Sequence, residues 1–255
     1  MTYFIAEIGV NHNGSVDEAF RLIDAAKLAN ADAVKFQAFS AARLKRPEIE
    51  HLELSRDALL ETRAYAKSVG IDWLCTPFDV EALGWVAVLK PPYMKLASGA
   101  IFDKALLKAA SNCGVPIIFS TGMSTLAEVR DALAVIGRPD VTLLHCVSAY
   151  PAPETAANLL SIITMRRTFM CDVGYSDHTV FADAVIVAIA LGARMIEMHI
   201  TRDNYQAGPD HKASYEPEHF AETVRRAKVA EVMLGDGVKS PQQCELPTRR
   251  IWKHD

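Results

Sequence analysis

The sequence predicts a single-domain α/β fold, a (β/α)8 TIM barrel. Short apolar runs alternate with longer amphipathic stretches, which is the pattern of βαβ units built around a parallel sheet. There are eight such runs, the number of strands in a TIM barrel. The chain has 255 residues, 50% of them hydrophobic, which is enough for one barrel core. A doubly wound open sheet is the alternative, but no GxGxxG motif follows the first run.

Each candidate strand is a short apolar run that ends in polar residues. The eight are YFIAEIGV (3–10), AVKFQ (33–37), DWLCTPF (72–78), YMKLAS (93–98), PIIFST (116–121), VTLLHCV (141–147), FMCDVGYS (169–176) and RMIEMHI (194–200).

The intervening stretches have helical periodicity. Residues 15–31 place Val16, Phe20 and Ile23 on one face, at the i, i+4, i+7 spacing of an amphipathic helix. Residues 217–237 predict a last helix in the same way.

Two helix starts carry the spacing of a capping box. Ser15 precedes Glu18 by three residues, and Thr125 precedes Glu128 by three residues. Both pairs therefore mark the first turn of a helix.

Composition limits the class of protein and its partners. We expect one barrel domain over residues 1–240 and a polar tail over 241–255. The net charge is −4 with the two signs mixed, which predicts no nucleic-acid partner, and no apolar run is long enough for a membrane span. The N-terminus lacks a signal-peptide pattern, and the odd number of cysteines without a CxxC pair favours reduced thiols in a cytoplasmic protein. The cysteines are Cys75, Cys113, Cys146, Cys171 and Cys244.

Polar side chains occur at the ends of all eight predicted strands, where TIM barrels carry their active sites. They are Glu7, Asn11, His12, Asn13, Lys35, Gln37, Thr76, Asp79, Lys95, Ser98, Ser120, Thr121, His145, Ser148, Tyr150, Ser176, Asp177, His178, Glu197 and His199. Lysines in two central strands are costly to bury without an anionic partner.

Each of these residues also has a structural interpretation. A strand-end serine or threonine often caps the next helix, and Lys35 alone could extend its amine out of the strand. We interpret His145 as a hydrogen-bonded core histidine. His51, His219 and His254 are interpreted as solvated.

Together, the strand ends predict a site for a small, highly charged substrate. Lys35 and Lys95 suit an anion such as a phosphate, with hydroxyl groups adding short hydrogen bonds. His178 and His199 come from adjacent strands and suit a Lewis-acid metal such as Mn²⁺ or Zn²⁺. Ordinary active-site or structural histidines remain an equal alternative. Glu197 and Asp177 are expected to orient the two rings.

A series of motifs carries a family resemblance from about Phe4 to about Gly235. In order, they are AEIGVNHNG, VKFQ, CTPFD, KLASG, STGM, LLHCVSAYPAP, GYSDHT, IEMHIT and GPDHKASYEP. The chain resembles the sialic acid synthase family, which contains the N-acetylneuraminate and related nonulosonate synthases.

The resemblance implies a TIM-barrel transferase that condenses phosphoenolpyruvate with N-acetylmannosamine or a related aldose. The product is a 3-deoxy-2-keto acid of nine carbons, with release of phosphate. A divalent metal at His178 and His199 is implied, typically Mn²⁺, with Mg²⁺ or Co²⁺ as alternatives. A homodimer is implied as well.

The resemblance also assigns roles by motif position. Glu7, Lys35, Lys95 and Asp210 are the catalytic group, with Glu7 the first candidate to activate the water that adds to phosphoenolpyruvate. The implied substrate-binding residues are Asn11, Gln37, Thr76, Ser98, Ser120, Ser148, Tyr150 and Ser176.

The chain departs from the family pattern at several positions. Ala100 stands where much of the family has an acidic residue, and Ser148 stands where asparagine is common. EMHIT replaces the more usual EKHFT around His199. Full-length members continue into a small antifreeze-like domain, so the resemblance covers the catalytic barrel only. The acceptor aldose is therefore expected to be open to variation.

Two other functions stay open at this level. One is a sugar-phosphate lyase or aldolase in which Lys35 or Lys95 forms a Schiff base. The other is a weakened homologue that binds a ligand without turnover. Ala100 and the lack of the antifreeze-like domain favour it, and the histidine pair and the two lysines argue against it.

Overall fold

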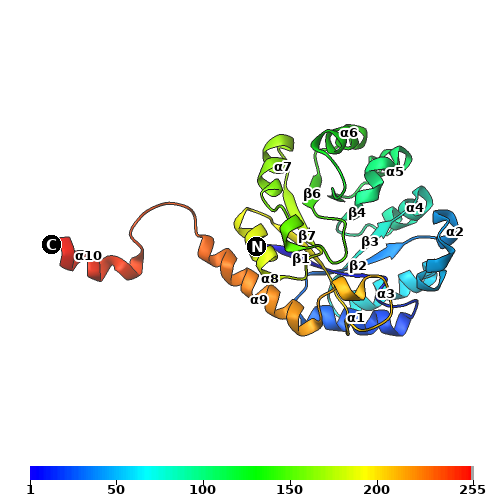
Figure 1. The fold of residues 1–255 in the computed structure, drawn as a ribbon, viewed down its shortest axis with the longest axis horizontal. Coiled ribbons are helices and arrows are strands. Elements are labelled where there is room, and N and C mark those ends of the chain that lie inside the picture. The colour runs from blue at the N-terminus through cyan, green and yellow to red at the C-terminus, as the bar shows by residue number, and fades with distance from the viewer. Residues whose placement is uncertain (254–255) are drawn as a thin grey trace.

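The computed structural model describes residues 1–253 and shows a (β/α)8 barrel (Figure 1). Eight parallel strands are hydrogen-bonded in the order β3-β2-β1-β8-β7-β6-β5-β4, and the end strands β3 and β4 contact each other. The strands are β1 (Tyr3–Gly9), β2 (Ala33–Ala38), β3 (Asp72–Pro77), β4 (Met94–Leu96), β5 (Ile117–Ser120), β6 (Val141–His145), β7 (Val173–Asp177) and β8 (Met195–His199). All eight predicted strands are present, so the predicted fold class is confirmed.

Eight helices surround the strands. They are α1 (Val16–Leu28), α3 (Arg56–Ser68), α4 (Val80–Val88), α5 (Lys104–Ala110), α6 (Leu126–Ile136), α7 (Ser161–Phe169), α8 (Ala182–Ala190) and α9 (Pro217–Leu234). Each turns an apolar face inward; Leu22 and Ile23 of α1, for example, are fully buried.

The loops at the carboxyl ends of the strands contain short helices. The connection from β2 to α3 includes α2 (Ala41–Leu44) and the 3-10 helix η1 (Pro47–Leu52). The remaining 3-10 helices of the strand-end loops are η2 (Ser98–Phe102), η3 (Glu154–Ala156) and η4 (His211–Ala213).

The C-terminal segment is more regular than the predicted polar tail. It contains the 3-10 helix η5 (Gln243–Glu245) and the helix α10 (Leu246–Lys253). Figure 1 shows this segment extending away from the barrel beyond α9. None of the residues of α10 is buried.

Several element boundaries differ from the sequence prediction by one or more residues, and two of them have a local backbone reason. The seventh strand begins at Val173, because Phe169 ends α7 and Met170 caps that helix with φ +52°. The last helix ends at Leu234, because Gly235 follows with φ +60°.

Only one of the two predicted capping boxes is complete. Thr125 and Glu128 exchange side chain-to-backbone bonds at the start of α6. Ser15 caps α1 by accepting from the Glu18 amide, but the Glu18 carboxylate accepts from Arg21 and Arg202 instead.

The core has two layers with different contents. The large layer lies between the strands and the helices, and it includes Phe4, Phe36 and Phe119. A small apolar cluster lies apart from it and comes from alternate residues of six strands: Ile5, Ala33, Leu74, Ile118, Leu144 and Met195. Because side chains alternate along a strand, the residues two positions further on point into the same barrel interior.

Across residues 1–253, none of the helices combines the length and the apolar character that crossing a membrane requires.

Candidate active site

A buried polar layer follows the small apolar cluster toward the carboxyl ends of the strands. Glu7, Lys35, Thr76, Ser120 and Glu197 each lie two residues after a member of that cluster. All five are at most 4% exposed. Strand alternation therefore brings ionisable groups from distant parts of the chain into one interior layer.

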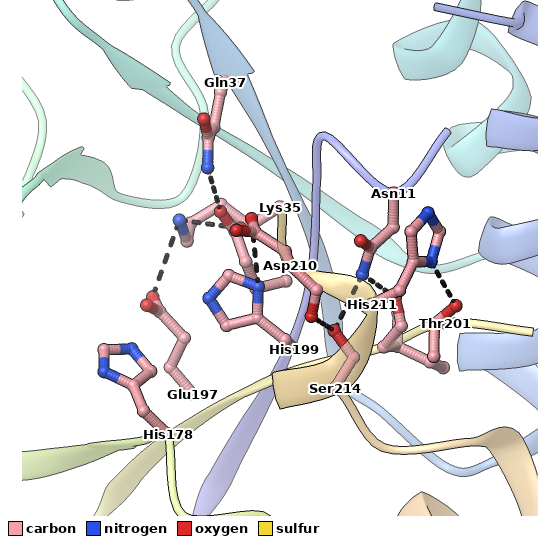
Figure 2. A network of polar contacts seen from close by, with 12 residues as sticks. Asn11, Lys35, Gln37, His178, Glu197, His199, Thr201, Asp210, His211 and Ser214 are labelled. Carbon is pink, nitrogen blue, oxygen red and sulfur yellow. Dashed lines mark hydrogen bonds and ion pairs between the residues drawn. The ribbon is translucent and has the colours of Figure 1, made fainter. Parts of the chain in front are cut away.

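Lys35 is the centre of the first half of this layer. Its Nζ lies 2.7 Å from Glu7 Oε2, and it donates to Thr76 Oγ1 at 2.9 Å. Gln37 Nε2 donates to the other Glu7 oxygen at 2.9 Å. Figure 2 shows Lys35 between its carboxylate partners, with Gln37 reaching in from above.

Glu197 is the centre of the second half. Its carboxylate lies 3.8 Å from Lys35 Nζ and 3.5 Å from Lys95 Nζ. Ser176 Oγ donates to it at 3.0 Å. Two carboxylates and two ammonium groups thus form a compact cluster whose formal charges cancel.

The two lysines differ in their electrostatic surroundings. Burial alone would lower the pKa of Lys35, but Glu197 and Glu7 outweigh burial and raise it. For Lys95, burial dominates and lowers the pKa, with Lys35 adding to the effect and Glu197 opposing it. Burial works against ionised Glu197, yet Lys35 and Lys95 lower its pKa overall. Lys35 is therefore a fixed cation, and Lys95 is the lysine that gains from an added anion.

His178 and His199 meet at the edge of this layer, with ring centroids 5.6 Å apart. His178 Nδ1 donates to the Val147 carbonyl at 2.6 Å, which leaves Nε2 on the other side of the ring. The Tyr150 ring lies over His178 with a centroid distance of 4.2 Å. Burial and the neighbouring His199 lower the pKa of His178 to about 4, so the imidazole is neutral at physiological pH.

His199 has an open position. Its Nδ1 is buried without a hydrogen-bond partner and lies 3.6 Å from Asp210 Oδ2. Imidazole nitrogens suit a divalent metal such as Mn²⁺ or Zn²⁺, and the only contact of His178 Nε2 among the described residues is a long one of 3.4 Å to Ser176 Oγ. Within residues 1–253, no three His, Cys, Asp or Glu side chains come together as a ready metal cage. The donors present therefore fit a two-histidine site whose other ligands are water or substrate.

One cavity of about 570 Å³ contains almost the whole predicted site. All but one of the fourteen predicted site residues line it, and they come from every strand end. They are Glu7, Lys35, Gln37, Thr76, Lys95, Ser98, Ser120, Ser148, Tyr150, Ser176, His178, His199 and Asp210.

Asn11 is the exception. Its side-chain amide donates to the Ile200 carbonyl at 2.9 Å and to Ser214 Oγ at 2.8 Å, and it is not among the cavity-lining residues. The prediction of a substrate-binding Asn11 is corrected, because this amide joins the loop after β1 to the loop after β8. Figure 2 shows it on the far side of Asp210 from Lys35.

Asp177 does not orient the histidines as predicted. Alternation turns it outward, where it accepts from the hydroxyls of Tyr175, Thr179 and Tyr215. The carboxylate of Glu197 bonds to lysines and Ser176. The Val147 carbonyl holds the His178 ring instead, and the carboxylate nearest His199 Nδ1 is that of Asp210 at 3.6 Å.

The other histidines behave largely as expected. His145 Nε2 is hydrogen-bonded to the Ala157 carbonyl at 2.8 Å, and His51 and His219 are exposed. His12 is buried and accepts from the Gly14 amide at 3.0 Å. His254 lies outside the described residues.

The sequence did not predict two features around the cavity. Gly122 supports the lining residue Ser98 by donating its backbone amide to Ser98 Oγ at 3.0 Å, and a Cβ at Gly122 would collide with Ser148. The other feature is an apolar wall of the cavity from the strand ends β1 to β3: Val10, Phe39, Leu44, Ile49, Leu52 and Phe78. The glycine of STGM could have indicated a close approach of the backbone to neighbouring side chains. The residues of the apolar wall, by contrast, cannot be distinguished in the sequence from ordinary core residues.

Ala100 is buried in the large core and does not line the cavity. The carboxylates that do line it are Glu7, Glu197 and Asp210.

A family model matches residues 22–239, which is most of the barrel. The chain belongs to the NeuB family. Its relatives include the N,N'-diacetyllegionaminic acid synthase of Campylobacter jejuni, 38% identical over 96% of this chain and 80% of that protein. The N-acetylneuraminate-9-phosphate synthase of Mus musculus is 34% identical over 96% of this chain and 74% of that protein.

A solved NeuB-like structure has the same architecture. The sialic acid synthetase of Leptospira borgpetersenii matches with a TM-score of 0.93 at 33% identity, covering 99% of this chain and 91% of that one. Membership of the NeuB family and these relatives support a synthase-like enzyme for nonulosonic acids.

Proposed function

We propose that this protein condenses phosphoenolpyruvate with N-acetylmannosamine or a related N-acylated aldose, giving a nonulosonic acid and phosphate. The supporting observation is one cavity that is lined by two buried lysines, several hydroxyls and the histidine pair His178 and His199. The five cysteines are free, which fits the reduced thiols of a cytoplasmic enzyme.

The anionic substrate is assigned to the lysine end of the cavity. Ser120 Oγ is buried without a hydrogen-bond partner, and Ser98 and Thr76 add hydroxyls beside it. The charges of the two lysines and two glutamates cancel, and burial makes an unpaired Lys95 cation costly. The phosphate and carboxylate groups of the substrate would supply the negative charge that stabilises it. We therefore place phosphoenolpyruvate against Lys35, Lys95 and Ser120.

His178 and His199 are assigned to a divalent metal, with Mn²⁺ first and Mg²⁺ or Co²⁺ as alternatives. Such an ion, when bound, supplies Lewis-acid polarisation of the aldehyde oxygen. The Val147 carbonyl fixes the His178 ring through Nδ1, so that Nε2 faces Ser176 Oγ at 3.4 Å, and Asp210 lies beside His199.

The bond changes in the reaction balance without any further reagent. C3 of phosphoenolpyruvate bonds to the aldehyde carbon, whose oxygen takes a proton and becomes a hydroxyl. Water then adds at C2 and loses one proton. The C2–O bond to phosphate breaks as the new C2 hydroxyl becomes the ketone, and its proton leaves with the phosphate. Glu7, held by Lys35 and Gln37, is the proposed acceptor of the water proton.

The acceptor aldose is assigned to the outer cavity beside the apolar wall. Phe39, Leu52 and Phe78 present hydrocarbon where the sugar tail would lie, and burying an unpaired hydroxyl or phosphate there costs free energy. Arg46 is the cation on that side, and Glu48 already pairs with it. This favours an unphosphorylated acceptor with N-acyl methyl groups.

The test is phosphate release from phosphoenolpyruvate with a panel of N-acetylated and phosphorylated aldoses. We expect release that depends on the aldose, increases with Mn²⁺ and stops with a chelator. The absence of aldose-dependent phosphate under every condition would remove the proposal.

A Schiff-base enzyme is the second candidate, because burial lowers the pKa of Lys95. Borohydride trapping with substrate distinguishes it: the synthase forms no imine adduct, whereas an aldolase would be labelled at Lys95.

A further inference from the structure

The loop after β8 carries Asp210 to the cavity and is held by a buried polar network (Figure 2). Asn11 Nδ2 donates to Ser214 Oγ at 2.8 Å, and Ser214 Oγ donates to the Asp210 carbonyl at 2.7 Å. Asn11 and Ser214 are at most 1% exposed. A chain of two hydrogen bonds therefore links the end of β1 to the main chain of Asp210.

A second set of bonds fixes the same loop. Thr201 Oγ1 is hydrogen-bonded to His211 Nδ1 at 2.7 Å, and Asn204 Nδ2 donates to the His211 and Ser214 carbonyls at 2.6 and 2.7 Å. The Tyr215 amide donates to the His199 carbonyl at 2.8 Å. The loop is thus hydrogen-bonded to the main chain of His199, the residue that Asp210 faces.

The Asp210 carboxylate, which this loop carries, lies beside His199 in the cavity. Asp210 Oδ2 lies 3.6 Å from His199 Nδ1, which is buried with no hydrogen-bond partner. Gly9, with φ +56°, leaves room for the Asp210 carboxylate. A Cβ at Gly9 would lie 3.4 Å from Asp210 Oδ2 and 3.2 Å from Glu7 Oε1. A small shift of the loop would change how Asp210 meets His199 and an incoming substrate.

We propose that Asn11 is a positioning residue, which sets the place of the Asp210 carboxylate in the acceptor half of the cavity through Ser214. It touches no substrate itself. Lys35, Lys95 and Ser120 lie outside this network, so the anion half of the cavity is unaffected by it. The kinetic part of this proposal rests on the proposed function.

The test compares Asn11→Ala and Ser214→Ala with Thr62→Val as a matched control. Thr62 in α3 is a fully buried hydroxyl that bonds to Leu59 and Trp73, and it takes no part in the hydrogen bonds of the loop after β8. Ser214→Ala keeps the bond from Asn11 to Ile200 and removes only the link to Asp210, so it serves if Asn11→Ala folds poorly.

With the aldose that supports turnover, we expect both site variants to raise its KM about 10- to 100-fold, because a misplacement of ~1 Å can cost about 100-fold. The KM for phosphoenolpyruvate should change less than about twofold. Combination with Asp210→Asn should be less than additive. Equal changes in both KM values, or full additivity, would overturn the proposal.

Amide hydrogen exchange tests the same idea without turnover. The amides of residues 203–215 should exchange faster in Asn11→Ala and Ser214→Ala than in the unsubstituted protein. Their exchange rates should be unchanged in Thr62→Val. Exchange at the wild-type rate in both variants would overturn the positioning role. If the unsubstituted protein releases no phosphate, the proposed function fails while the exchange result still decides the role of Asn11.

Discussion

At the residue scale, the site depends on which groups are neutral and which are charged. His178 is held neutral by burial and by His199, and its Nδ1 is occupied by Val147. Lys35 stays charged between two carboxylates. This division separates the half of the cavity that we propose for the anion from the histidine half that we propose for a metal.

Replacing either histidine tests the metal half. We expect His178→Ala and His199→Ala each to abolish metal-dependent phosphate release, because one imidazole cannot hold the ion in place. Circular dichroism should show an intact barrel, and titration with Mn²⁺ should show weaker binding. Full activity in either variant would contradict the assignment.

The two lysines should respond oppositely when replaced by methionine. Lys35→Met leaves Glu7 without its ion pair and should lower the free energy of unfolding by about 3 kcal/mol. Lys95→Met removes a cation whose pKa is lowered by burial, and Glu197 keeps Lys35 and Ser176. Its unfolding free energy should be unchanged or about 1 kcal/mol higher.

Urea unfolding measures both variants, and phosphoenolpyruvate binding by calorimetry should be lost in both. A larger loss of stability in Lys95→Met than in Lys35→Met would contradict the electrostatic argument.

Much of the site could be predicted from where polar residues follow apolar runs. Ser176 and His178 point inward by strand alternation, and the same alternation turns Asp177 outward. The outward direction of Asp177 was therefore predictable from the sequence. Asn11 was different: its partner Ser214 lies 203 positions away, and nothing local to NHNG shows that contact.

At the scale of the elements, the helix starts show how far local signals reach. Thr125 and Glu128 make a complete box because both partners lie within one turn. Glu18 has the same spacing, but Arg202 from the loop after β8 competes for its carboxylate. Tertiary partners of this kind cannot be read from a four-residue motif.

Removing the complete cap should destabilise the barrel modestly. Thr125→Ala is expected to lower the free energy of unfolding by about 1 kcal/mol, which corresponds to roughly 2–4 °C in the melting temperature of a chain this long. Differential scanning calorimetry measures the shift. Thr125→Ser retains the hydroxyl and should show a clearly smaller one.

At the scale of the whole molecule, the barrel and the segment that follows it differ in burial. Val232, Met233, Ile251 and Trp252 are each at least 73% exposed, at the end of α9 and in α10. The family resemblance implies a homodimer, and these apolar side chains are where we expect a second copy to pack.

Sedimentation measures this expectation. The full chain should sediment as a dimer, and a variant that ends after Gly237 should sediment as a monomer with an unchanged barrel. Identical sedimentation states for the two chains would show that this segment does not hold the copies together.

The extended C-terminal segment also has a consequence for handling the protein. Arg249 and Arg250 lie in a helix without buried residues, whereas the barrel helices are anchored in the core. Trypsin should therefore cleave first in this segment and leave a resistant fragment that contains the whole cavity. The catalytic barrel would then be separable from its C-terminal segment by a single early cut.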